Sequence, residues 1–159
     1  MNHEFCDSGK HMILFLDVDG VLHPLIPRKD RPASEAAQLS YLPRLAGVLS
    51  QYPDIRIVIS STWRVTRTLD QLRTLFPLPL QHRLIGVTPV LDEARFPGGR
   101  ELEALEWLDA HAPGEEWIAL DDCAPCWTSL WRLVICDDGF RDDEERELRE
   151  MIERWDETK

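Results

Sequence analysis

The chain has 159 residues, of which 43% are hydrophobic and 30% are charged, and this composition excludes a disordered polypeptide and predicts one globular domain. The formal net charge of -11 argues against strong non-specific binding to nucleic acid, which depends on Lys and Arg. No apolar run approaches the roughly 20 residues that cross a bilayer. Residues 1–11 lack the apolar core of a signal peptide, so we expect a cytoplasmic protein with no membrane partner. We expect residues 1–11 to be a flexible lead-in and residues 12–159 to form a single domain.

The first half of the chain alternates apolar runs with amphipathic segments. Residues 12–18 predict a buried strand that ends before Gly20, and residues 41–51 predict a helix with an apolar face. Residues 55–60 predict a second strand. A helix is then expected at 64–76, stopped by the prolines at 77 and 79, and a third strand at 83–88.

The second half continues the same alternation. Residues 100–111 predict a helix with Leu102, Leu105 and Leu108 on one face, ended by Ala-Pro-Gly at 112–114. Strands are expected at 116–120 and 131–135, and a charged amphipathic helix at 142–155 closes the chain.

Strands that alternate with helices predict an α/β fold with three layers, Rossmann-like, in which a mainly parallel five-stranded sheet has helices on both faces. Ligands of such folds bind outside the carboxyl ends of the strands. The segment between residue 22 and the second strand is short, and its Pro24, Pro27, Pro32 and Pro43 leave no room for a sizeable cap domain.

Two pairs of carboxylates directly follow predicted strands. Asp17 and Asp19 end the first strand, where Gly20 allows a sharp turn, and Asp121 and Asp122 end the fourth. If these strands are neighbours, three or four carboxylates converge, and their mutual repulsion favours a bound hard cation such as Mg²⁺. The alternative is that each acid only caps a strand, but two such pairs argue against it.

The run Asp17-Val-Asp19-Gly20-Val-Leu resembles the signature of the haloacid dehalogenase (HAD) superfamily, most of whose members are phosphatases. That family also has a Ser or Thr after the second strand, a basic residue that opens a later helix, and an acidic pair after the fourth strand. The sequence S-S-T-W-R at 60–64, the R-x-x-E-A-x-x-W-L helix from residue 100 and the L-D-D strand end resemble a small, nearly capless subgroup related to the HAD domains of RNA-repair proteins.

The resemblance implies a role for each carboxylate in a single HAD-like catalytic domain. Asp17 would attack phosphorus and form an aspartyl phosphate, and Asp19 would protonate the leaving oxygen and then activate water. Mg²⁺ would be held by Asp17, by Asp19 through its carbonyl, and by Asp121 or Asp122.

The remaining candidates would contact the phosphate. Ser61 is the expected catalytic hydroxyl and Ser60 its competitor. Arg100 would neutralise phosphate charge where the family usually has Lys, with Arg64 and Arg95 as rivals. The further candidates for substrate binding are Ser60, Arg64 and Gly20.

Three other features have a structural alternative beside a functional one. His23 and Trp63 are candidates for substrate contact, or else structural side chains. Cys123 and Cys126 have the C-x-x-C spacing of redox and zinc sites, but without a secretion signal we expect free, partly buried thiols.

The resemblance therefore implies a magnesium-dependent phosphatase that hydrolyses phosphomonoesters through an aspartyl phosphate. Without a cap, its partner would be a phosphorylated substrate that can be bulky, such as a nucleic-acid end, or a small molecule such as a nucleotide. The alternative is a catalytically inactive binding module that keeps the HAD fold, against which the complete set of motif residues argues.

Overall fold

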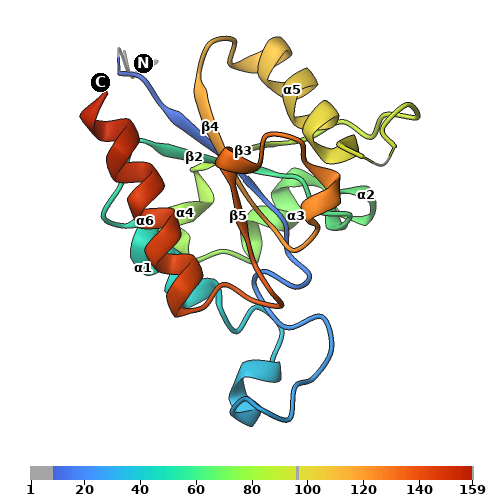
Figure 1. Cartoon of the computed structure of the whole chain (residues 1–159), viewed down its shortest axis with the longest axis vertical. Helices are drawn as coiled ribbons and strands as arrows, with labels where there is room; N and C mark the ends of the chain where they lie inside the picture. Colours follow the sequence, from blue (N-terminus) through green and yellow to red (C-terminus); the bar gives the residue numbers. More distant parts are fainter. Residues whose placement is uncertain (1–8, 96, 159) are drawn as a thin grey trace.

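Five parallel strands form the centre of the computed structural model, which describes residues 9–95 and 97–158 (Figure 1). The strands are β1 Met12–Leu16, β2 Ile55–Ile59, β3 Leu84–Val87, β4 Glu116–Asp121 and β5 Leu133–Ile135. Their order in the sheet is β3-β2-β1-β4-β5, so β1 and β4 are neighbours, as the acidic pairs require. The predicted parallel α/β architecture is confirmed. The lead-in predicted at 1–11 falls largely on residues 1–8, which lie outside the described residues.

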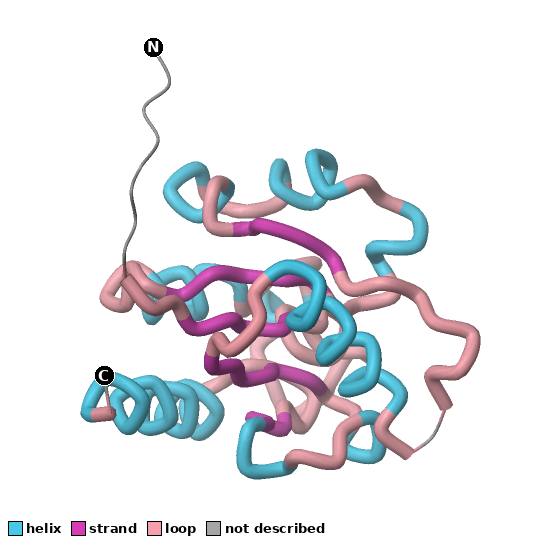
Figure 2. Tube along the Cα trace, turned by 90° about the horizontal axis from the view of Figure 1, so that it is seen from above, coloured by secondary structure: helices cyan, strands magenta, loops and turns pink. Residues whose placement is uncertain are grey.

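Helices cover both faces of the sheet (Figures 1 and 2). On one face, α1 (Leu42–Leu49), α3 (Leu69–Thr74), α4 (Leu78–Gln81) and α6 (Asp142–Glu157) contribute to the larger apolar core. On the other face, α5 (Gly99–His111) and the 3-10 turn η2 (Ala124–Cys126) enclose a smaller core rich in aromatic rings, among them Phe15, Trp107, Trp117 and Trp127. The short α2 (Trp63–Thr66) and the 3-10 turns η1 (Ala33–Ala36) and η3 (Leu130–Arg132) lie in the connections.

The helix predicted at 64–76 is wrong, because the structure has two helices there. The chain is extended at Arg67, and Thr68 then begins α3 with a capping box in which its hydroxyl accepts from the Gln71 amide. The prolines do stop α3, but Pro77 also caps α4, whose first turn tolerates Pro79. The last strand begins at Leu133 and not at 131, since η3 precedes it.

The three leucines that were expected to share one face of α5 are not buried together. Leu108 is buried, but Leu102 and Leu105 are 41% and 45% exposed, while Glu101 and Glu103 are buried in their place. Glu101 accepts hydrogen bonds from the Thr128 hydroxyl and the Ser129 amide, and Glu103 pairs with an arginine described below. The buried side of this helix therefore combines an apolar stripe of Ala104, Trp107 and Leu108 with two glutamates that have polar partners.

The connection from β1 to β2 holds only η1 and α1 among its described elements, so the predicted absence of a sizeable cap is confirmed. In Figure 1 this connection extends from the lower end of the sheet. Among the described residues, no helix has the length and the apolar character that a transmembrane span requires.

Candidate active site

Polar residues occupy equivalent positions at the ends of three neighbouring strands, β2, β1 and β4. Leu16 is in register with Ile59 and with Leu120. Backbone hydrogen bonds from the Asp17 amide to Leu120 and from the Ser60 amide to Leu16, both 3.0 Å, extend this register by one residue. Because side chains alternate along a strand, Asp17, Ser60 and Asp121 follow on the same face, at the carboxyl edge of the sheet.

Three carboxylates converge at this edge. Oxygen atoms of Asp17, Asp121 and Asp122 lie within 4.8 Å of one another, and the first two side chains are buried. Gly20 has a φ of 76°, and a Cβ atom at this position would overlap the carboxylate of Asp122. The glycine therefore allows the two acidic segments to approach each other, which is a different role from the substrate contact predicted for it.

The cluster carries an electrostatic cost that a cation would remove. Burial, followed by the nearby charge of Asp121, raises the pKa of Asp17 from 3.8 to about 8, although Arg100 opposes this shift. Burial also raises the pKa of Asp122, whose side chain is hydrogen-bonded to Asp17. The raised pKa values mean that the Asp17–Asp122 pair retains a proton while no cation is bound. The ligand atoms that the three side chains offer are all carboxylate oxygens, which suit a hard divalent cation.

The shifted pKa predicts how stability changes with pH when no metal is added. Between pH 4 and 8 the folded protein holds a proton on Asp17 that the unfolded chain has released, so the free energy of unfolding should fall as the pH rises through this range, by roughly a few kcal/mol. Urea unfolding in chelator at several pH values measures this slope. Asp17→Asn should flatten it, and excess Mg²⁺ should weaken it, because a cation favours the ionised group. An equal slope in Asp17→Asn would contradict the assignment.

Arg100 is the arginine that reaches the carboxylates. Its Nη1 atom lies 3.2 Å from Asp17 Oδ2 and 2.6 Å from Asp121 Oδ2. Burial opposes the charge, but the two carboxylates together raise the pKa of Arg100 above its usual value. The residue sits in the first turn of α5, which begins after Gly98 at a φ of 81°, and the Gly98 amide donates to the carbonyl of Pro125.

Asp121 has a second function that sequence reasoning missed. Its Oδ1 accepts from the Cys123 amide at 2.8 Å, and its Oδ2 accepts from Trp127 Nε1 at 3.1 Å as well as from Arg100. Oδ2 therefore accepts from two donors and Oδ1 from one. A buried Trp usually needs a hydrogen-bond acceptor for its ring N–H, and this requirement is the signal that could have pointed to the contact between Trp127 and Asp121. Asp121 therefore holds Arg100 in place, while Asp122 has fewer protein contacts and can bind a cation.

The two candidate serines are placed differently. The Ser61 hydroxyl oxygen accepts from the Trp63 amide at 3.2 Å and so helps to begin α2. The Ser60 hydroxyl is buried beside Asp17 in the register and has no hydrogen-bond partner among the described residues. A buried hydroxyl without a partner is costly unless a ligand completes it, which favours Ser60 over the expected Ser61.

The structure contradicts Arg64 as a substrate ligand. Its guanidinium donates to the carbonyls of Ser60, Ser61 and Thr88 at 2.9 to 3.1 Å, and pairs with Glu103 at 3.0 Å. The side chain is only 6% exposed. Arg64 therefore fixes the carboxyl ends of β2 and β3, and Glu103, three residues after Arg100 on the same face of α5, is its partner.

Asp19 lies at the mouth of the site, with 41% of its side chain exposed. His23 and Trp63, which were candidates for substrate contact, both point their ring N–H groups at its carboxylate. Asp19 is not one of the three clustered carboxylates among the described residues, and it is more exposed than Asp17, which it follows by two residues.

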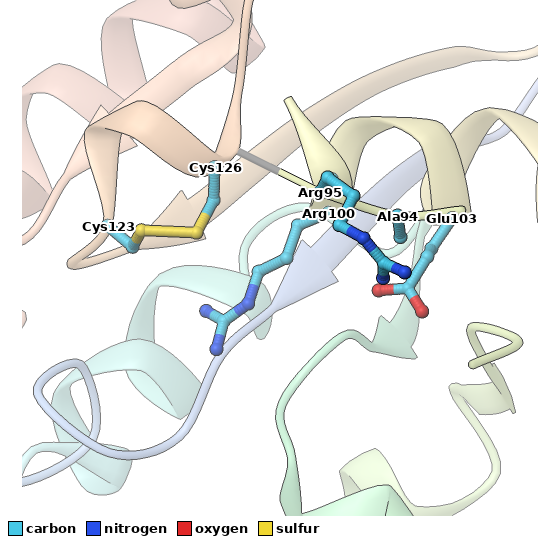
Figure 3. A pocket seen from close by; sticks show the side chains of 7 residues that line it. Ala94, Arg95, Arg100, Glu103, Cys123 and Cys126 are labelled. Carbon is cyan, nitrogen blue, oxygen red and sulfur yellow. A yellow bond between two sulfur atoms is a disulfide. The ribbon is translucent and has the colours of Figure 1, made fainter. Parts of the chain in front are cut away.

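The expectation of free thiols at Cys123 and Cys126 is wrong, because the two residues form a disulfide. Figure 3 shows this disulfide on one wall of a cavity of about 410 Å³, facing the segment that carries Arg95 and Arg100. The remaining lining residues are Ala94, Gly99 and Glu103. The disulfide closes the turn whose Cys123 amide holds Asp121, so it stabilises one side of the candidate site.

The family model described as "HAD domain in Swiss Army Knife RNA repair proteins" matches residues 13–152. This match confirms the resemblance seen in the motifs and covers the five strands except for the first residue of β1. No curated protein and no solved structure matches the chain significantly.

Proposed function

Because the chain belongs to the family of HAD domains in Swiss Army Knife RNA repair proteins, we propose that it is a magnesium-dependent phosphatase acting on phosphate monoesters. HAD domains are in general hydrolases of this kind. The observation that carries the proposal is the convergence of Asp17, Asp121 and Asp122 within 4.8 Å, with Arg100 bound to two of them.

The residues fit a magnesium ion. Asp17 and Asp122 would be its carboxylate ligands, with the backbone carbonyl of Asp19 as a third, and Asp121 would act indirectly by holding Arg100. When bound, the ion supplies positive charge that favours the ionised form of Asp17 and offsets the charge of the phosphate oxygens. The raised pKa of Asp17 supports this assignment, since burial first and the nearby charge of Asp121 second disfavour its ionised form, which a bound cation would favour.

In the first step a carboxylate oxygen of Asp17 forms a bond to phosphorus while the bond to the leaving oxygen breaks, and Asp19 gives that oxygen a proton. In the second step Asp19 takes a proton from water as the water attacks phosphorus, which releases inorganic phosphate and frees Asp17. Arg100 and the hydroxyl of Ser60 would hold the phosphate oxygens throughout.

The substrate class follows from the open site. Without a cap, a bulky phosphorylated group can reach Asp17, and the cavity beside Arg100 has the volume of a small-ligand pocket. The family description names RNA repair, so phosphorylated RNA ends are the first class to test, with nucleotides as the small-molecule alternative. The net charge of -11 means that such recognition would depend on local contacts and not on a basic surface.

The test is hydrolysis of p-nitrophenyl phosphate in chelator and in Mg²⁺, followed by a panel of 3′- and 5′-phosphorylated oligoribonucleotides and nucleotides. We expect turnover only with the metal, and a preference within the panel. Turnover that does not need a metal would contradict the proposal, and inactivity on every ester would favour a binding module.

A further inference from the structure

The carboxylate of Asp19 is held from two sides. His23 Nε2 lies 2.8 Å from its Oδ1 atom, and Trp63 Nε1 donates to its Oδ2 atom at 3.0 Å. One donor comes from the loop after β1 and the other from the start of α2, so two separate segments fix the same side chain. Each carboxylate oxygen keeps one further lone pair free.

The backbone determines which nitrogen of His23 carries the proton. The amide of Leu39 donates to His23 Nδ1 at 3.1 Å, and an amide can only donate. Nδ1 must therefore be the acceptor, and the neutral ring carries its hydrogen on Nε2, directed at Asp19. Only 12% of the His23 side chain is exposed, so water competes little for these bonds.

The segment that supplies this amide is strained. Leu39 has a φ of 59°, in the left-handed region that costs a residue with a Cβ atom roughly 1 to 2 kcal/mol. Such conformations persist where the surroundings enforce them, often at functional sites. On the other side, the Gly20 amide donates to the His23 carbonyl at 3.0 Å and closes the loop.

Trp63 is fixed just as firmly. The guanidinium of Arg67 lies 4.0 Å from the centre of its ring, and the ring of His23 lies 5.9 Å away, tilted by 42°. Its N–H is used by Asp19, which leaves the indole no free donor for a substrate. Neither ring therefore has the open polar group that substrate recognition would need.

We propose that His23 and Trp63 are positioning residues that fix the carboxyl group of Asp19, so that the lone-pair position they leave free, which carries the proton when Asp19 acts as the acid, faces the leaving oxygen of the phosphate ester. The inference rests on the proposed phosphatase function, in which Asp19 transfers the proton. A carboxyl group held at both oxygens cannot rotate about its Cβ–Cγ bond, and correct placement of a proton donor can be worth about 100-fold in rate.

The test exploits the leaving group. An alkyl phosphate requires protonation of its leaving oxygen, whereas 2,4-dinitrophenyl phosphate releases a stable anion and does not. We measure kcat/KM for both esters, because this quantity covers formation of the aspartyl phosphate and excludes its later hydrolysis. A structural defect would slow both esters equally, and a positioning defect only the alkyl ester.

The variants are His23→Phe and Trp63→Phe, which keep an aromatic ring and remove the donor. Each should lower kcat/KM for the alkyl ester about 10- to 100-fold, with a change below about 3-fold for the dinitrophenyl ester. His23→Gln keeps an N–H of similar reach and should recover much of the loss. Trp131→Phe, at a ring 73% exposed and away from Asp19, is the control and should change neither value.

Equal losses on the two esters, or no loss on either, would overturn the inference and leave the phosphatase proposal intact. A wild-type protein that hydrolyses neither ester would instead overturn the phosphatase function, and this inference with it. Asp19→Asn should show the same selective loss, larger in size.

Discussion

Replacing Asp17 by Asn should lower kcat for any phosphate ester by about 10⁴- to 10⁶-fold, the effect of removing the nucleophile from an enzyme that works through a covalent intermediate. The amide is close to the carboxyl group in shape, but its single oxygen carries no negative charge and is a poor nucleophile toward phosphorus. Steady-state assays with p-nitrophenyl phosphate in Mg²⁺ measure the loss. Acid quenching with a labelled substrate should also trap phosphate on the wild-type chain and not on the variant.

The variant should remain folded, because Asp17 carries a proton up to about pH 8 without a metal and the amide is likewise neutral. Asp109→Asn, at an exposed position of α5, makes the same chemical change outside the site and should keep full activity. If Asp17→Asn retained more than a small fraction of the wild-type rate, another nucleophile would have to be found.

The two acids at the end of β4 should respond in opposite ways to the same substitution. Asp122→Asn removes a charge from the cluster, so the metal-free protein should become more stable by about 1 to 2 kcal/mol, as when a functional site loses its strain. Asp121→Asn should instead lower stability by about 1 to 3 kcal/mol, because buried donors of Arg100 and Trp127 lose a charged acceptor.

Both variants should lose most activity, but for different reasons. Asp122→Asn should need at least about 100-fold more Mg²⁺, since it removes a direct ligand, whereas Asp121→Asn should mainly lower kcat through a misplaced Arg100. Chemical unfolding in chelator and metal titration of the rate measure the two effects. Stability changes of equal sign, or an unchanged Mg²⁺ requirement in Asp122→Asn, would contradict these roles.

Much of the fold could be predicted because apolar runs mark parallel strands clearly. The five strands, the sheet type and the missing cap all follow from such runs and from the prolines between them. The burial of Glu101 and Glu103 on α5 could not be predicted, because their partners Thr128 and Arg64 lie 27 and 39 residues away in the chain.

The candidate site also has features that the sequence predicts and features that it does not. The convergence of Asp17 with Asp121 and Asp122 follows from strand ends, whereas the approach of Arg100 from a later helix follows from the resemblance to the HAD superfamily. The choice between Ser60 and Ser61 depends on a register of one residue, which composition does not reveal. The occupation of Arg64 by backbone carbonyls and the disulfide at Cys123 and Cys126 depend on side-chain geometry in the folded chain.

The missing cap has a consequence for selectivity. Enzymes with a mobile lid can use closure to reject a wrong substrate, and the rate of opening can then limit turnover. Here the connection between β1 and β2 holds only η1 and α1, so discrimination must come from static contacts around the mouth. Abundant small phosphate esters would compete at Asp17, and a second binding surface, on this chain or on an attached domain, would raise the effective concentration of the correct end.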